Sequence, residues 1–213
     1  DELDSTSGAW KTFYQANKPA AYGVDQTLGT NPLWQKLANL DQAKSNYGAI
    51  VYNKAPGVLK QLNYLIGENA FQNGVRDFLR RYAYSNATWR ELLGALGRAA
   101  NRPLDDFGRN FVLRPGMPYI EQRLAVRDGR IAKLELVQRS AQRGVSGSAA
   151  WPMRTQVLLA YPGKSAVRLP VFANARVTEV TAARGLPAPA FAFPNAEDYG
   201  YFLSILDSAS VRS

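Results

Sequence analysis

The segment Arg114-Pro115-Gly116-Met117-Pro118 divides the chain into two parts with different hydrophobic periods. Two prolines and a glycine in five residues interrupt any regular element. Before this segment, apolar residues recur three or four positions apart, which is typical of helices. After it, apolar and polar residues alternate, which is typical of strands. This order predicts an α+β protein, with a helical segment over residues 1–117 and a small β-sandwich over residues 118–213.

Local signals predict five helices in the first part. A capping residue or a proline begins four of them, and Gly67 ends the second. The first is expected to begin at Pro32 after the cap Asn31 and to carry Leu33, Trp34, Leu37 and Leu40. The third is expected to run from about Glu68 to Tyr82. The starting signals are Asn31-Pro32, Pro56, Asn86 or Thr88, and Asn101-Arg102-Pro103, and the third helix follows the stop at Gly67.

The second part contains a clear hairpin signal. Asp128-Gly129 lies between two alternating runs, 119–126 and 131–138, and this dipeptide favours the tight turn of a two-stranded hairpin. Turn residues recur at short intervals further on, so more short strands are expected. Their expected ranges are 153–160, 166–172, 175–181, 188–193 and 199–206, and the loop 139–150 is expected to be mobile.

Composition excludes several kinds of chemistry within these 213 residues. There is no His, so no His general base or Ser-His-Asp triad can form. There is no Cys, so disulfides, cysteine nucleophiles and thiolate metal sites are absent. Carboxylates alone rarely bind zinc, so no metal-ligating residue is predicted here.

The net charge of +9 is spread over both parts of the chain. Nucleic-acid-binding proteins usually concentrate basic residues on one face, so we predict no nucleic-acid partner. No apolar run approaches the length of a membrane span. The acidic start of the chain does not resemble a signal peptide, and the compartment stays open.

Several motifs occur in an order that resembles a known family. The residues that carry the resemblance are 24–33, Tyr47–Leu59, Leu65–Phe71, Tyr82–Thr88, Arg114–Ile120, Trp151–Met153 and Asp198–Asp207. Together they resemble the M1 family of zinc aminopeptidases, the aminopeptidase N-like gluzincins, over nearly the whole chain. There are departures: Ala55-Pro56 replaces the usual Gly-Ala, and Leu203 replaces the usual Arg.

The resemblance implies a role for two tyrosines. Tyr52 matches the family's catalytic tyrosine, whose phenol would donate a hydrogen bond to the oxyanion of the transition state. Tyr47, five residues earlier, either binds substrate in the same cleft or is a packing aromatic. For Lys54 two interpretations are open, namely a pair with an upstream carboxylate or an ordinary surface lysine.

The resemblance also implies what the chain is part of. The family's H-E-x-x-H motif and its third zinc ligand precede the Tyr52 segment, and they are absent here. The chain would therefore be a fragment: the helical C-terminal part of a thermolysin-like catalytic domain, followed by a β-sandwich. Zinc and peptide substrate are expected only with the full-length enzyme, and the fragment alone is expected to be inactive.

Two further expectations remain. Helix faces uncovered by truncation would allow the fragment to self-associate. The alternative function is a non-catalytic protein-binding or scaffold module that uses a peptidase-like framework.

Overall fold

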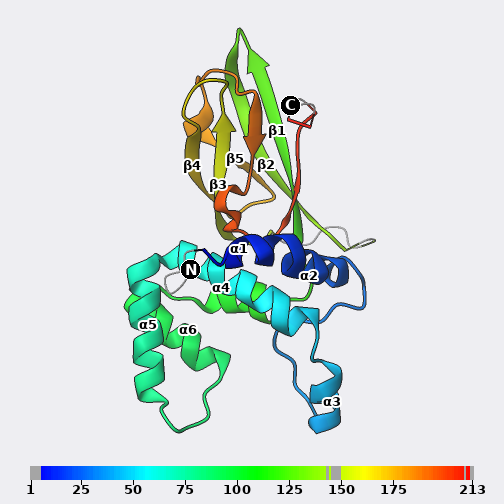
Figure 1. Cartoon of the computed structure of the whole chain (residues 1–213), viewed down its shortest axis with the longest axis vertical. Helices are drawn as coiled ribbons and strands as arrows, with labels where there is room; N and C mark the ends of the chain where they lie inside the picture. Colours follow the sequence, from blue (N-terminus) through cyan, green and yellow to red (C-terminus); the bar gives the residue numbers. More distant parts are fainter. Residues whose placement is uncertain (1–5, 143, 145–149, 209, 212–213) are drawn as a thin grey trace.

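A computed structural model describes residues 6–142, 144, 150–208 and 210–211. Figure 1 shows the strands gathered at one end of the molecule and the long helices at the other. Helices α1, α2 and α4 lie next to the sheets, whereas α3 and the α5–α6 pair project away from them (Figure 1). The protein is therefore a mixed helix and sheet structure with two sheets, which is compatible with the predicted α+β class.

The helical part combines α-helices with π-helical turns. A continuous helical stretch is formed by α1 (Ala9–Thr12), a π-helical turn (Phe13–Asn17) and α2 (Lys18–Asp25). A second π-helical turn (Ile50–Lys54) runs directly into α4 (Ala55–Ile66). The remaining elements are α3 (Leu40–Ser45), α5 (Glu68–Arg81), α6 (Trp89–Ala99), α7 (Asp105–Phe107) and a π-helical turn (Gly108–Val112).

Two of the predicted helix boundaries follow the local chemistry closely. Gly67 adopts a φ of 87° between α4 and α5, a value that favours glycine and ends α4. Thr88 begins α6 as a capping box: its side chain accepts from the N–H of Arg90, while Glu91 accepts from the backbone N–H of Thr88 at 2.8 Å.

The helix predicted after Asn31-Pro32 is wrong. Residues 31–38 form no helix, and α3 starts only at Leu40, where the Asn39 side chain accepts from the N–H of Gln42 at 2.9 Å. A long-range contact holds residues 31–38 in a non-helical conformation, because the N–H of Trp34 donates to the carbonyl of Val112 at 3.1 Å. The helical stretch from Ala9 to Asp25 was not among the predicted helices.

The strands form two sheets. The first has the order β5-β2-β1-β7, and the second has the order β4-β3-β6. The bounds are β1 (Pro118–Arg127), β2 (Arg130–Ser140), β3 (Met153–Ala160), β4 (Val167–Ala173), β5 (Val177–Glu179), β6 (Phe191–Phe193) and β7 (Leu203–Ile205). The last three are shorter than predicted.

The predicted hairpin is confirmed. Strands β1 and β2 pair antiparallel, and Asp128 and Gly129 turn between them with φ values of 51° and 71°. Both values match the left-handed conformation that this turn needs. Of the loop predicted over 139–150, residues 143 and 145–149 lie outside the described residues.

One hydrophobic core connects the helices to both sheets. Val58 and Leu62 of α4, Ile120 and Leu134 of the first sheet, and Val157 of the second all belong to it and are almost fully buried. The segment Tyr199–Phe202, which precedes β7, packs against α4 and carries two further core aromatics, Tyr201 and Phe202. None of the helices that the structure describes is long and apolar enough to cross a membrane.

Candidate functional site

Tyr52 lies on the π-helical turn that precedes α4. Its backbone N–H donates to the carbonyl of Gly48 at 3.0 Å, and 60% of the residue is exposed. Its ring meets that of Tyr47 edge to face, with the ring centres 6.1 Å apart. Among the described residues, none accepts or donates a hydrogen bond at the Tyr52 hydroxyl. The structure therefore brings the two predicted tyrosines together and leaves the Tyr52 phenol available as a donor.

Lys54 belongs to the same turn but faces the interior. Only 1% of the residue is exposed, and its Nζ lies 2.8 Å from Oδ2 of Asp25. The same Nζ donates to the carbonyl oxygen of Gly116 at 2.8 Å. Of the two interpretations left open by the sequence, the pair with an upstream carboxylate is the one observed. Lys54 thus fastens the turn both to the end of α2 and to the segment that enters β1.

The Asp25 carboxylate is fully buried and has three polar partners. Besides Lys54, it accepts from the Thr30 hydroxyl at 2.6 Å and from the Tyr201 hydroxyl at 3.0 Å. Burial lowers the pKa of Lys54, and the Asp25 charge opposes that shift. Burial also raises the pKa of Tyr201 well above its ordinary value, so its hydroxyl keeps the proton that it donates to Asp25.

Two buried ammonium groups lie close to the Tyr201 ring. Lys54 Nζ is 5.5 Å and Lys18 Nζ is 5.9 Å from the centre of its ring. The ring approaches α4 so closely that a Cβ at Gly57 would lie 3.0 Å from its Cδ2. Its backbone N–H donates to Oε1 of the buried Gln61 at 2.8 Å. The ring, the hydroxyl and the backbone of Tyr201 are therefore all held by the helical part.

Lys18 makes a second buried connection to the same segment. Its Nζ lies 2.5 Å from Oδ1 of Asp198 and 2.8 Å from the carbonyl of Gly200. Burial lowers the pKa of Lys18 to about 8 despite this pairing, and burial raises the pKa of Asp198. Two lysines from the helical part thus anchor the chain near residues 116 and 198–201.

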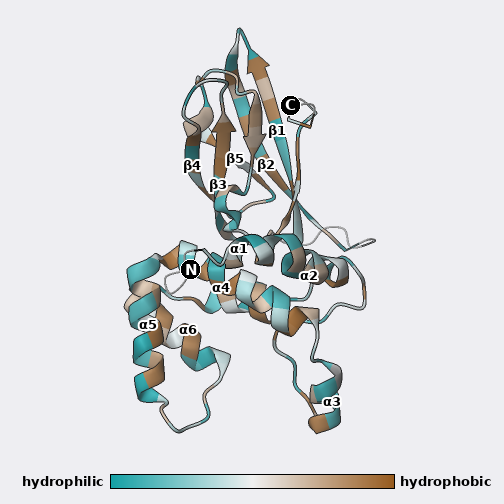
Figure 2. Ribbon diagram, viewed as in Figure 1, coloured by the Kyte–Doolittle hydropathy of each residue, from teal (hydrophilic) through white to brown (hydrophobic). Residues whose placement is uncertain are grey.

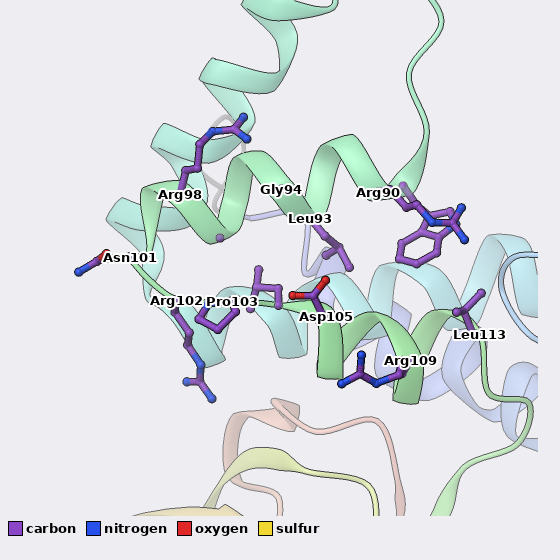
Figure 3. Close-up of a pocket in the computed structure, with 13 residues that line it drawn as sticks. Arg90, Leu93, Gly94, Arg98, Asn101, Arg102, Pro103, Asp105, Arg109 and Leu113 are labelled. Atoms are coloured by element: carbon purple, nitrogen blue, oxygen red, sulfur yellow. The ribbon is translucent and has the colours of Figure 1, made fainter.

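A cavity of about 580 Å³ lies elsewhere, beside α6 and the segment that follows it. Arg90, Arg98, Arg102 and Arg109 line it, but neither Tyr47 nor Tyr52 does. Figure 3 shows that Arg98 and Arg102 point to opposite sides rather than toward a common point. Arg98 pairs with Asp77 at 3.0 Å. The side chains do not converge on a ligand, so we do not assign the functional site to this cavity.

No metal centre can be assembled from the residues that the structure describes. No group of three His, Cys, Asp or Glu side chains is close enough to hold a metal ion there. The buried carboxylate of Asp25 and the partly buried carboxylate of Asp198 are already paired with lysines. These residues do not fit a zinc site.

Sequence reasoning predicted Tyr52 and Tyr47 as site residues, but it did not predict most of the buried network. Lys18, Asp25 and Tyr201 were not predicted as site residues. Asp25 and Tyr201 lie 176 positions apart, and only the fold brings them to one point. The available signal was modest: both lie inside segments, 24–33 and Asp198–Asp207, that carry the family resemblance.

The helical part of the chain matches the model of a known protein family. The family model of the Peptidase family M1 domain matches residues 1–111, more than half of the chain. The chain therefore belongs to peptidase family M1.

Known relatives extend the similarity beyond the helical part. "Aminopeptidase N" of Streptomyces lividans is 28% identical over 212 residues, which cover 95% of this chain and 25% of that protein. "Aminopeptidase M1-C" of Oryza sativa is 27% identical over 152 residues, or 70% of this chain and 17% of that protein. "Tricorn protease-interacting factor F2" of Thermoplasma volcanium is 23% identical over 73% of this chain and 20% of that protein. The chain spans a quarter or less of the length of these relatives.

Proposed function

We propose that this chain is part of a zinc-dependent aminopeptidase that hydrolyses N-terminal residues from peptides. Membership of family M1 and the similarity to proteins named aminopeptidases support this activity. The observation that carries the proposal is the Tyr52 phenol, which is exposed beside Tyr47 on the turn before α4. Within the described residues its hydroxyl has no other hydrogen-bond partner.

Tyr52 would act on the transition state rather than on the bound peptide. Attack of water on a peptide carbonyl places negative charge on the carbonyl oxygen. A phenol is protonated near neutral pH and donates a hydrogen bond, which strengthens as that charge develops. Loss of one such donor typically lowers kcat about 10²–10³-fold. Tyr47, whose ring contacts that of Tyr52, would bind the substrate beside it.

We assign the zinc to a part of the protein outside these 213 residues, because the described residues do not supply its ligands. In this proposal, residues 1–117 form the C-terminal part of a thermolysin-like catalytic domain. Residues 118–213 form the β-sandwich domain that follows it. The 213-residue chain alone would neither bind zinc tightly nor hydrolyse peptides.

The experiment that tests this function uses the chain extended upstream in its native reading frame. We expect the extended protein to release an N-terminal residue from an aminoacyl reporter, to lose that activity on treatment with a chelator, and to regain it with zinc. An extended protein that is inert with zinc, or an upstream frame without H-E-x-x-H, would contradict the proposal. The second candidate, a non-catalytic binding module, would then take its place.

A further inference from the structure

Tyr52 and Lys54 lie on opposite sides of one π-helical turn. Tyr52 is 60% exposed, whereas Lys54 is 1% exposed. Isolated π-helical turns are rare, and they occur often at functional sites. The position of the Tyr52 side chain therefore depends on what holds this turn in place.

We propose that Lys54 is a positioning residue for Tyr52. The Tyr201 hydroxyl supports this role because it helps to hold Asp25, the carboxylate that binds Lys54. This inference rests on the role proposed above for Tyr52. It implies that the segment before β7, about 150 residues after Tyr52 in the chain, affects the rate of catalysis.

The Lys54 ammonium has little freedom to move. It is held by the Asp25 carboxylate at 2.8 Å and the Gly116 carbonyl at 2.8 Å, and the Tyr201 ring lies 5.5 Å away. These partners come from α2, from the entry to β1 and from the segment before β7. Since Lys54 is two residues from Tyr52, a shift of the ammonium moves the turn that carries the phenol.

Tyr201 fixes the Asp25 end of the pair. Its hydroxyl donates to the same Oδ2 atom that Lys54 contacts. Two contacts with α4 hold the position of Tyr201. Its ring packs directly against Gly57, and its backbone N–H donates to the Gln61 side chain. The path from Tyr201 through Asp25 to Lys54 is therefore a chain of short contacts between buried groups.

Stability alone does not account for this arrangement. Replacement of a buried ion pair by apolar residues of similar volume is often neutral or stabilising. Hydrogen bonds among Lys54, Asp25 and the Tyr201 hydroxyl depend on the orientation of these groups and therefore fix it, whereas apolar contacts do not. Directional contacts are what an active-site donor requires, because a misplacement of about 1 Å can lower the rate about 10²-fold.

The test is a double-mutant comparison in the upstream-extended protein with zinc. Tyr201→Phe removes only the hydroxyl and keeps the ring. We expect it to lower kcat about 10-fold with little change in KM, by analogy with small misplacements of catalytic groups. In the Tyr52→Phe background the same substitution should have no further effect on kcat, because the group that it positions is already absent.

A matched control comes from Tyr22, which is also buried and packs against Tyr201 with ring centres 5.1 Å apart. Its hydroxyl donates to the carbonyl of Phe202 at 3.0 Å and makes no contact with Lys54. Tyr22→Phe also loses one buried hydrogen bond but should leave kcat unchanged. Lys54→Arg is a second variant of the network, for use if Tyr201→Phe unfolds, and it should show the same dependence on Tyr52.

A measurement without catalysis uses the 213-residue chain with 3-fluorotyrosine at position 52. We expect Tyr201→Phe to shift or broaden the ¹⁹F resonance, and Tyr22→Phe to leave it in place. An unchanged resonance in Tyr201→Phe would overturn the inference, and so would an equal fall in kcat in both Tyr52 backgrounds. If Tyr52→Phe alone leaves kcat unchanged, the proposed function fails, while the resonance still reports on positioning.

Discussion

Lys54 Nζ lies 2.8 Å from Oδ2 of Asp25, and neither side chain is more than 1% exposed. An ion pair at this depth has no water to replace a lost partner. Removal of either charge therefore leaves the other buried without a partner. The pair joins the end of α2 to the turn that carries Tyr52, so its energetics bear on both stability and function.

Asp25→Ala should destabilise the 213-residue chain by about 3–5 kcal/mol, because it leaves the Lys54 charge buried without a carboxylate. Urea denaturation followed by circular dichroism measures this change. Asp77→Ala is the matched control, since Asp77 pairs with Arg81 and Arg98 at the surface. Its loss should be far smaller. Equal losses in the two variants would contradict the buried pair.

Two helical glycines should respond to alanine with opposite signs. A Cβ at Gly74 of α5 would lie 2.8 Å from the Leu96 Cα of α6, so Gly74→Ala must push the two helices apart. A Cβ at Gly94 would meet only the Arg98 guanidinium, at 3.6 Å. Gly94→Ala should therefore stabilise by about 0.5–1 kcal/mol through helix propensity. Thermal unfolding of both variants tests this, and a stabilised Gly74→Ala would be the contrary result.

Stability should rise with pH above about pH 8 because of Lys18. Its pKa is about 8 in the folded chain, whereas the ordinary pKa of a lysine is 10.5, so between these values the unfolded chain binds more protons. Lys18 alone contributes a slope of at most about 1.4 kcal/mol per pH unit. Burial lowers the pKa of Lys54 as well, so Lys54 adds to the rise in the same direction. The raised pKa values of Tyr22 and Tyr201 act in the opposite sense only from about pH 10.

Lys18→Met isolates this contribution. The difference in unfolding free energy between wild type and variant should grow in favour of wild type from about pH 8 to about pH 10, the range between the folded and ordinary pKa values. Urea titrations at several pH values measure it. A difference that does not change with pH would contradict the assignment to Lys18.

We predict that the 213-residue chain self-associates through its helical part. Large apolar side chains are exposed there, among them Leu28 at 74% and Leu40 at 66%. Figure 2 shows hydrophobic residues at the outer end of α3, which projects away from the sheets. Exposed apolar surface of this kind favours association. Light scattering should detect a species larger than the monomer as concentration rises, and a strict monomer would contradict the prediction.

The sequence predicted those features that depend on neighbouring residues. Gly67 and Thr88 set helix boundaries by their own backbone and side-chain chemistry, and Asp128-Gly129 defines its hairpin. The helix expected after Asn31-Pro32 failed because a distant carbonyl, that of Val112, binds the Trp34 N–H. A capping signal cannot report a bond to a residue so far along the chain.

The candidate site also contains both local features that the sequence could predict and long-range contacts that it could not. Tyr52 and Tyr47 could be predicted as neighbours because they lie in one short motif, five residues apart. The partners of Lys54 could not, since Asp25, Gly116 and Tyr201 come from separate regions and only packing brings them together. A buried lysine and a surface lysine also look alike in a single sequence.

The central claim is that the Tyr52 hydroxyl stabilises the transition state of peptide hydrolysis. The most direct measurement is kcat and KM of Tyr52→Phe in the upstream-extended protein with zinc, beside Tyr47→Phe as the neighbouring variant. We predict that Tyr52→Phe lowers kcat about 10²–10³-fold with KM nearly unchanged, because the donor acts only on the developing oxyanion. Tyr47→Phe should mainly raise KM. A Tyr52→Phe enzyme with wild-type kcat would contradict this role.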